Sequence, residues 1–248
     1  MRDLRGYEPP SDGLKDRVIL VTGATAGIGR AVSRALVGHG AHVILHGRNA
    51  RALDALCRDL RDFGPEPLAV QLDLERAQGD AYQALIERLE SRFGQLDGLV
   101  HNAGMLGKLS PIEHYDIGLW QKVIHVNLTA AFILTRCLVP LMRPSQDASV
   151  VFTTSSVGHR ARAYWGAYAV SKFGIEGLAQ TLADELEHTR IRVNCINPGK
   201  TRTAMRRAAY PAEDPRTLPL PETLTAPYLY LLGPDSRGVT GERIDVQG

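Results

Sequence analysis

The segment Val18-Ile19-Leu20-Val21-Thr22-Gly23-Ala24-Thr25-Ala26-Gly27-Ile28-Gly29 decides the fold. Its apolar first half does not alternate with polar residues, which is typical of a strand buried on both faces. The three glycines suit a tight turn, the close approach of a phosphate and close packing of the following helix on the strand. That helix offers free N–H groups to a pyrophosphate. The segment predicts a dinucleotide-binding turn; an ordinary αβ turn is the alternative, and a P-loop is excluded because no Gly-Lys-Ser/Thr follows.

The same strand–helix rhythm continues along the chain. Helical periodicity is found over 28–39, 50–63, 79–93, 115–142, 168–188 and 221–232, and further short apolar runs occupy 42–46, 68–72, 98–101, 149–153, 191–196 and 243–246. Strands that alternate with helices indicate right-handed βαβ units. We therefore predict an α/β protein: a single-domain Rossmann fold over 1–248, with a doubly wound seven-stranded parallel sheet and helices on both faces.

Composition excludes several classes of function. The chain has 248 residues and a net charge of +2, too small to indicate a nucleic-acid or membrane partner. Its three cysteines lack CxxC spacing and its histidines lack HExxH spacing, so we expect no metal site. The N-terminus has no signal-peptide pattern and no run approaches the ~18 apolar residues of a membrane span. We expect a cytoplasmic protein with a loosely held arm over 1–14.

Two positions at strand ends bear on the cofactor. The second strand ends at Arg48, where a site specific for NAD usually has Asp or Glu. A guanidinium suits a 2′-phosphate by charge and geometry, so Arg48 favours NADP(H), and a solvated strand-end charge is the alternative. After the third strand, Asp73-Leu74 can meet the adenine, although Asp73 could equally cap a turn.

Further motifs follow the glycine turn along the chain. Asn102-Ala103-Gly104 follows the fourth strand, Asn127 lies in the long helix, Ser155 follows the fifth strand, Tyr168 and Lys172 form YxxxK, and Pro198-Gly199 precedes Thr203. With the glycine turn, these motifs resemble the short-chain dehydrogenase/reductase family over about residues 18–203. Trp165-Gly166-Ala167-Tyr168 and the stretch 201–206 resemble its bacterial YciK-like subgroup.

The resemblance implies a set of roles. It implies catalysis by Asn127, Ser155, Tyr168 and Lys172, and packing of the two long helices in a homodimer or homotetramer. It implies cofactor contacts from Gly23, Thr25, Ala26, Gly27, Ile28, Gly29, Arg48, Asp73, Leu74, Asn102, Ala103, Gly104, Tyr168, Lys172, Pro198, Gly199, Thr201 and Thr203. It also implies that Lys172 binds the nicotinamide ribose, and that Asn127 binds a water linked to Lys172.

The residues support this reading independently. Tyr168 and Lys172 lie four apart on one predicted helix and share a face. A nearby ammonium favours the phenolate, so we expect the pKa of Tyr168 below its usual value, as suits a proton carrier. Ser155 can hold a carbonyl oxygen as a neutral donor. The family spacing favours Ser155, and Ser156 remains a second candidate. Asn127, within an apolar helix, must be hydrogen-bonded if it is buried.

The predicted activity is transfer of a hydride between nicotinamide and a carbonyl or alcohol carbon of a small molecule. A non-catalytic NADP(H)-binding regulator and a different Rossmann enzyme, such as a methyltransferase, are the alternatives. The proline-rich stretch 200–221 predicts an irregular loop that covers the substrate, and a plain surface loop is the alternative. We expect pocket walls from 156–164, 105–112 and 200–221. Their basic residues, His159, Arg160, Arg162, Arg202, Arg206 and Arg207, either clamp an anionic substrate or serve solubility.

Overall fold

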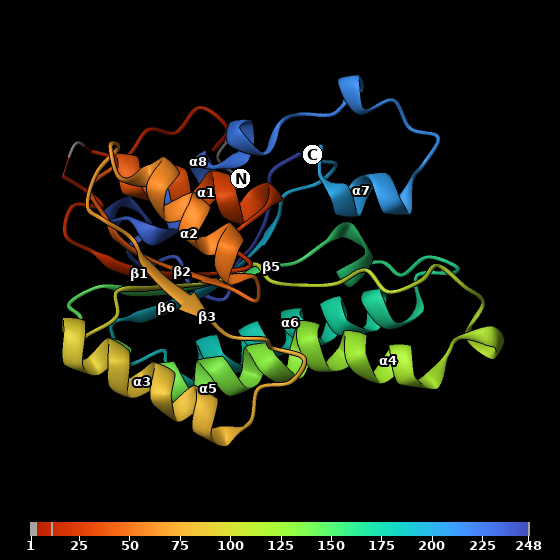
Figure 1. Ribbon diagram of the computed structural model, residues 1–248, viewed down its shortest axis with the longest axis horizontal. Coiled ribbons are helices and arrows are strands. Elements are labelled where there is room, and N and C mark those ends of the chain that lie inside the picture. The colour runs from red at the N-terminus through yellow and green to blue at the C-terminus, as the bar shows by residue number, and fades with distance from the viewer. Residues whose placement is uncertain (1–3, 11, 248) are drawn as a thin grey trace.

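The computed structural model describes residues 4–10 and 12–247, in which seven parallel strands form one central sheet (Figure 1). The strands are β1 Val18–Thr22, β2 His42–Gly47, β3 Leu68–Gln71, β4 Gly98–His101, β5 Ala148–Thr153, β6 Ile191–Asn197 and β7 Arg243–Asp245. Their order is β3-β2-β1-β4-β5-β6-β7, so the direction of winding reverses between β1 and β4. Open α/β sheets bind ligands beyond the carboxyl ends of the strands at such a reversal.

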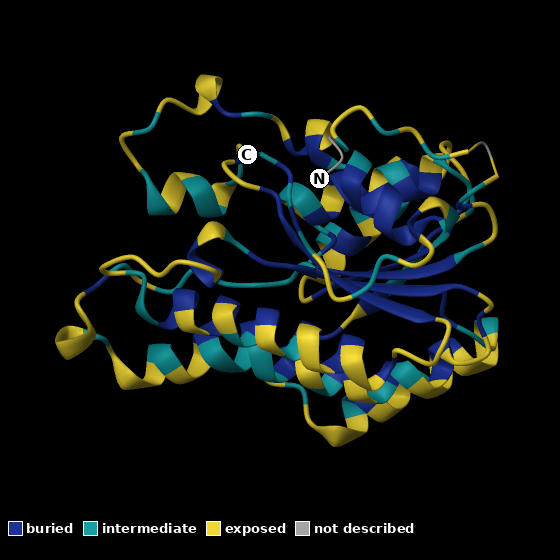
Figure 2. Cartoon of the chain, turned by 180° about the vertical axis from the view of Figure 1, so that it is seen from behind, coloured by how far each residue is buried: buried dark blue, intermediate teal, exposed yellow. Residues whose placement is uncertain are grey.

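Helices cover both faces of the sheet (Figures 1 and 2). One face carries α1 Gly27–Gly38, α2 Ala50–Leu60 and α8 Ala226–Leu232; the other carries α3 Gly79–Phe93, α4 Ile117–Ile124, α5 Ala130–Met142 and α6 Gly166–Glu185. Successive strand residues point to opposite faces, so Leu20 and Ile44 pack in one core while Val21 and Leu45 pack in the other. Figure 2 shows the strands buried and the outer faces of the helices exposed.

The predicted fold class is confirmed, and the strands lie within one residue of the predicted ends. Two predictions about segments need correction. The stretch 200–221, expected to be irregular, contains the helix α7 Ala204–Ala209, which Thr203 caps by accepting a hydrogen bond from the Arg206 amide. The single helix expected over 221–232 is instead a 3₁₀ turn, Pro221–Leu224, followed by α8. Pro227 explains the break, because proline lacks the N–H that a helix interior requires.

The arm predicted over 1–14 lies partly outside the described residues, at 1–3 and 11. Its described part packs on the body of the protein. The ring of Tyr7 meets that of Tyr230 edge-on at 5.2 Å, and its hydroxyl donates to Asp235 at 3.1 Å. Leu14 is fully buried. This part of the arm is therefore held by contacts with the segment around α8, rather than loosely as expected.

One long helical stretch is apolar overall. A π-helical turn, His125–Thr129, joins α4 to α5 and makes one helical rod of 26 residues, Ile117–Met142. By length and composition the rod could cross a membrane, since its most apolar window has a mean hydropathy of 1.5. Within the fold, 44% of that window is buried, and α5 contributes Leu134 and Leu138 to a core. The rod is not an unbroken apolar run, because polar residues such as Asn127 interrupt it.

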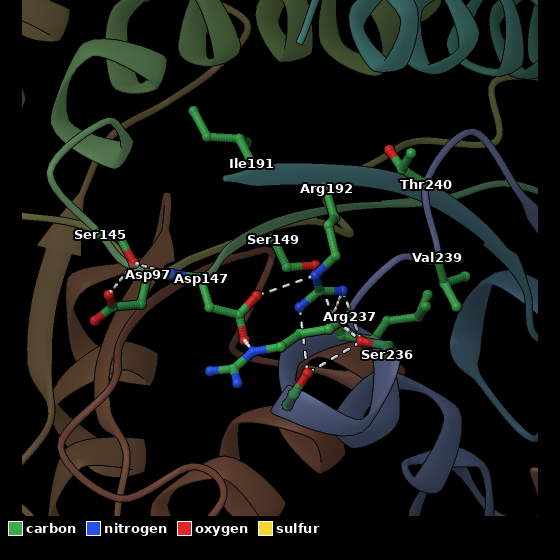
Figure 3. Close-up of polar contacts among 12 residues, drawn as sticks. Asp97, Ser145, Asp147, Ser149, Ile191, Arg192, Ser236, Arg237, Val239 and Thr240 are labelled. Atoms are coloured by element: carbon green, nitrogen blue, oxygen red, sulfur yellow. Dashed lines mark hydrogen bonds and ion pairs between the residues drawn. The ribbon is translucent and has the colours of Figure 1, made fainter. Parts of the chain in front are cut away.

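A network of charges ties down the amino edge of the sheet, opposite the predicted site (Figure 3). Arg192 of β6 donates to Asp147 at 3.1 Å, and the same guanidinium donates to Ser236 at 2.6 Å. Asp147 also faces Arg237 and Arg17, both at 3.4 Å. Because Asp147 and Arg192 are both buried, their hydrogen bonds offset the cost of removing two charges from water. The network therefore links β5, β6 and the chain after α8.

Candidate active site

A cleft of about 460 Å³ opens at the carboxyl edge of the sheet. It runs from the glycine turn after β1, past the ends of β4, β5 and β6, to α7. The predicted site residues that line it are Gly23, Thr25, Ala26, Gly27, Ile28, Arg48, Asp73, Leu74, Asn102, Ala103, Gly104, Ser155, Tyr168, Lys172, Pro198, Gly199, Thr201 and Thr203. Two predicted residues, Gly29 and Asn127, do not line it. The chain thus brings nearly all of the predicted residues to one cleft.

The glycine turn forms a cradle that larger residues would fill. Gly23 has φ +65°, and a Cβ there would lie 2.9 Å from the Cα of Ala103. A Cβ on Gly29 would lie 2.3 Å from the carbonyl oxygen of Gly23, so this glycine lets helix and strand approach each other rather than lining the cleft. The hydroxyl of Thr22 accepts from the amides of Asn102 and Ala103 at 2.9 and 3.0 Å. The ends of β1 and β4 are therefore held together under the cradle.

Arg48 and Asp73 stand at the end of the cleft next to β2 and β3. Arg48 is exposed and lines the cleft, and no ion pair of its side chain is found among residues 4–10 and 12–247. The guanidinium N–H donors of an exposed arginine without an ion pair are available to a ligand. Asp73 also lines the cleft, but its carboxylate accepts from the amide of Glu75 at 3.1 Å. The turn-capping alternative for Asp73 is thus realised, next to any part it has in binding.

His46, two residues before Arg48, also lines the cleft, although no sequence motif singles it out. Its side chain is 2% exposed, and neither ring nitrogen has a hydrogen-bond partner. Burial lowers the pKa of His46 to about 4, while nearby backbone groups of Leu72 and His46 work in the opposite direction. Burying an imidazole without a hydrogen-bond partner costs free energy. Its presence in the cleft wall therefore suits a site in which a bound polar ligand supplies the missing hydrogen bond. With the glycine cradle and Arg48, this wall fits a phosphorylated dinucleotide.

Tyr168, Ser155 and Lys172 converge in the cleft. Tyr168 lies at the start of α6, and its ring centre is 5.7 Å from the Lys172 ammonium. A hydrogen bond from Ser155 reaches the Tyr168 phenol. Ser155 lines the cleft, whereas Ser156 is exposed and lies outside its wall. The structure therefore places a phenol, a hydroxyl and an ammonium together at the C-terminal edge of the sheet.

The expected lowering of the Tyr168 pKa is wrong for this structure. Burial raises the pKa of Tyr168 to about 12, and the hydrogen bond from Ser155 only opposes that rise. The physical reason is burial, because removal of the phenol from water disfavours its charged form; the nearby Lys172 Nζ donates to the carbonyl of Thr153 at 2.7 Å. Burial also lowers the pKa of Lys172 to about 8, which leaves the ammonium mostly protonated at neutral pH. The phenol is consequently held in its protonated form.

Asn127 sits in the π-helical turn, a feature often found at functional sites. Its amide is fully used: it accepts from the Met105 amide at 2.8 Å, donates to the Met105 carbonyl at 2.9 Å, and donates to Ser171 at 3.0 Å. Asn127 thus fixes the loop after β4 to α6. A Cβ on Gly104 would lie 3.3 Å from Asn127 and 3.9 Å from Lys172, so both side chains border the same backbone position.

The expected pocket walls need correction. Residues 156–164 do not line the cleft, so His159, Arg160 and Arg162 stay outside it. From 105–112 only Met105 and Leu106 take part, and from 200–221 the wall takes residues of α7, including Met205 and Arg206. Sequence reasoning also missed Trp165. Its place three residues before Tyr168 was the available signal.

Comparison with known proteins decides the family. A family profile described as short chain dehydrogenase matches residues 17–214. The oxidoreductase YciK of Escherichia coli K12 is 47% identical over 242 residues, which cover 97% of this chain and 96% of that protein. The chain belongs to the short-chain dehydrogenase/reductase family. The resemblance to the YciK-like subgroup is confirmed as well.

Solved structures agree with this assignment. A short-chain dehydrogenase from Pseudomonas syringae is 51% identical, with a TM-score of 0.95, over 97% of this chain and 98% of that one. One from Escherichia coli CFT073, complexed with NADPH, is 47% identical, with a TM-score of 0.94, over 97% and 100%. This dehydrogenase/reductase is therefore an oxidoreductase with a Rossmann-like fold that acts on small molecules.

Proposed function

We propose that this dehydrogenase/reductase uses NADP(H) to interconvert a carbonyl compound and its alcohol, with Tyr168 as the proton carrier. One observation carries the proposal. A buried phenol, hydrogen-bonded by Ser155 and next to Lys172, stands in the same cleft as the glycine turn. A hydride donor bound on the turn and a proton donor on α6 would then reach one carbonyl group from the same cleft.

The adenosine end of the cleft supports NADP(H) over NAD(H). No carboxylate stands at the end of β2 to bond a ribose 2′-hydroxyl; Gly47 and Arg48 occupy that place. Arg48 offers a charged fork suited to a 2′-phosphate. The complexes of the Escherichia coli CFT073 and Shigella flexneri neighbours with NADPH and NADP are consistent with this choice. The remaining contacts proposed for the cofactor come from the cleft residues given above, from Gly23 to Thr203.

The protein residues do the acid–base part of the reaction. Bound NADPH supplies a hydride to the carbonyl carbon, and negative charge develops on the carbonyl oxygen. Tyr168 donates a proton to that oxygen, and its pKa of about 12 keeps the proton available at neutral pH. Ser155 donates a hydrogen bond to the same oxygen. The products are the alcohol, NADP⁺ and the Tyr168 phenolate, which takes up one proton from solvent before the next turnover, so atoms and charge balance; the reverse reaction needs the Tyr168 phenolate to accept the proton.

We propose supporting roles for Lys172, in binding the cofactor, and for Asn127, in holding a loop. An ammonium has three donors, and one of those of Lys172 is used by the Thr153 carbonyl. The others can bind the hydroxyls of the nicotinamide ribose. Asn127 holds the Met105 backbone against α6, and so keeps the loop after β4 in place beside Lys172.

A panel of aldehydes, ketones and quinones tests the proposal. The purified protein is mixed with NADPH, and the absorbance of the reduced nicotinamide is followed. We expect turnover that Tyr168→Phe abolishes while NADPH binding is kept. Tyr164→Phe is the matched control, because Tyr164 is 60% exposed and outside the cleft wall. Tight NADPH binding without turnover would favour a non-catalytic regulator, and no nicotinamide binding would favour another Rossmann enzyme such as a methyltransferase.

We also propose a homo-oligomer, a dimer or tetramer, through α5 and α6. Phe132 on α5 and Phe173 on α6 are 48% and 44% exposed, unusual for such large apolar side chains. A second copy of the chain would cover them. Sedimentation of the wild type and of Phe173→Asp tests this: a monomeric wild type would contradict it.

A further inference from the structure

The substrate end of the cleft is apolar. Leu106, Trp165 and Met205 pack around Tyr168, and each of the three is only partly buried. The Trp165 ring lies 5.8 Å from the ring of Tyr168 and 5.8 Å from that of Tyr210. These side chains line the cleft without a protein partner on that side. Partly exposed apolar walls gain free energy when an apolar ligand covers them.

Arg206 is the arginine that lines this end of the cleft, and its charge is paired within the protein. Its Nε and Nη2 donate to the two carboxylate oxygens of Glu213 at 2.6 and 2.7 Å. Its guanidinium also lies over the Tyr210 ring, 3.7 Å from the centre. Glu213 raises the pKa of Arg206, and Arg206 lowers the pKa of Glu213, so both stay charged and paired. The fork that could bind a substrate carboxylate is thus occupied.

The other cations near this end are hydrogen-bonded within the protein, stand outside the wall, or have a place in the proposed cofactor site. Arg202 donates to the carbonyls of Arg216 and Leu218 at 3.4 Å. Lys172 donates to the Thr153 carbonyl, and its remaining donors are those proposed above for the nicotinamide ribose. Arg162 points to the Tyr210 hydroxyl at 3.5 Å and lies outside the cleft wall. The arginine-rich sequence therefore does not produce an anion site in the folded protein.

We propose, building on the carbonyl reduction above, that the substrate is an uncharged ketone or aldehyde with a flat apolar body, aromatic or alicyclic. That body lies against Trp165, Leu106 and Met205, with the carbonyl oxygen at Tyr168. Glu213 acts as a specificity-determining residue, because its pairing with Arg206 withholds the cation that an anionic substrate would need. The reaction is unchanged: the carbon gains a hydride, the oxygen gains a proton, and NADPH becomes NADP⁺.

Matched substrate pairs test the proposal first on the wild type. Each pair is an aryl or alicyclic ketone and the same ketone bearing a carboxylate away from the carbonyl. We expect kcat/KM to favour the neutral member at least about tenfold, the factor that about 1.4 kcal/mol represents. Equal or better turnover of the carboxylated members would overturn the proposed substrate class. No turnover of either member would instead count against the carbonyl reduction itself.

The variant Glu213→Gln tests the specificity role of Glu213 directly. It weakens the hold on Arg206 by removing the carboxylate charge, so the preference for the neutral ketone should shrink about tenfold. The gain should come from a lower KM for the carboxylated ketone. Glu222→Gln, an exposed position in the next 3₁₀ turn, is the matched control and should leave the ratio unchanged. An unchanged ratio in Glu213→Gln would remove Glu213 from the specificity role.

Ligand binding without turnover gives an independent readout. Trp120 and Trp165 are the only tryptophans in the sequence, so Trp120→Phe leaves Trp165 as the single indole. In its complex with NADP⁺, this variant should lose Trp165 fluorescence when the neutral ketone binds, and respond at least about tenfold more weakly to the carboxylated partner. Absence of any response to the neutral ketone, in a preparation that turns it over, would place the apolar body away from Trp165.

Discussion

We expect two buried histidines to make this protein sensitive to mild acid. His46 and His101 are 2% and 6% exposed. Burial lowers the pKa of His46 to about 4 and that of His101 to about 3, from an ordinary 6.5. His101 has one partner, Thr135 at 2.9 Å, and its ring stacks on Phe152. Both rings therefore stay neutral in the folded protein where an unfolded chain would already be protonated.

The direction of the change in unfolding free energy with pH follows from which state binds protons first. Below pH 6.5 the unfolded state takes up protons on both histidines before the folded state does, so stability falls as pH falls. Above 6.5 both states are neutral and the effect vanishes. At about pH 5, each histidine has cost roughly 2 kcal/mol of unfolding free energy relative to about pH 7.5, and the pair roughly 4 kcal/mol. The loss continues until the pH passes the folded pKa values.

Urea unfolding at a series of pH values measures this loss. His46→Leu should remove about half of it, roughly 2 kcal/mol between about pH 7.5 and about pH 5. His188→Leu is the matched control, because His188 is exposed beyond α6 and should leave the pH dependence as in the wild type. Identical acid slopes for the wild type and His46→Leu would refute the reasoning, since His46 would then titrate alike in both states.

Three further perturbations have clear outcomes. Arg48→Ala should weaken NADPH binding by at least about tenfold and leave NADH binding nearly unchanged, as calorimetry would show; equal losses for both would remove Arg48 from the 2′-phosphate. Asp147→Ala leaves the buried Arg192 without its anion and should cost about 3–5 kcal/mol of unfolding free energy in urea. Trp165→Ala should raise KM for an aryl ketone several-fold with kcat little changed; a fall in kcat alone would contradict a binding role.

The cofactor half of the cleft could be predicted because it depends on backbone requirements. Gly23 must adopt φ +65°, and Gly29 must let a strand and a helix meet, so the sequence has no freedom at either position. Motif spacing along single elements, as between Tyr168 and Lys172 on α6, can be read in the same way. Such features are local, and no distant segment is needed to place them.

Features that depend on distant segments could not be predicted. His42 and His46 occupy equivalent positions of one apolar strand, yet the His42 side chain is 40% exposed at the amino end while His46 is buried at the carboxyl end. The neutralisation of Arg206 depends on the chain turning back so that Glu213 reaches it. The pKa of Tyr168 was misjudged for the same reason, because its rise comes from burial of the phenol, which depends on how distant segments pack around it.

Hydrogen-bonding capacity separates a structural cation from a functional one in this fold. Arg192, buried at the amino edge, uses all three guanidinium nitrogens: Nε on Asp147, Nη1 on Leu231 and Ser236, and Nη2 on Gly233. Lys172, equally buried, makes one hydrogen bond with its three donors and lines the cleft. A buried charge without full bonding is costly, so its retention at the cleft is explained if a ligand completes the set. Arg206 lies between these two cases, because Glu213 holds its Nε and Nη2.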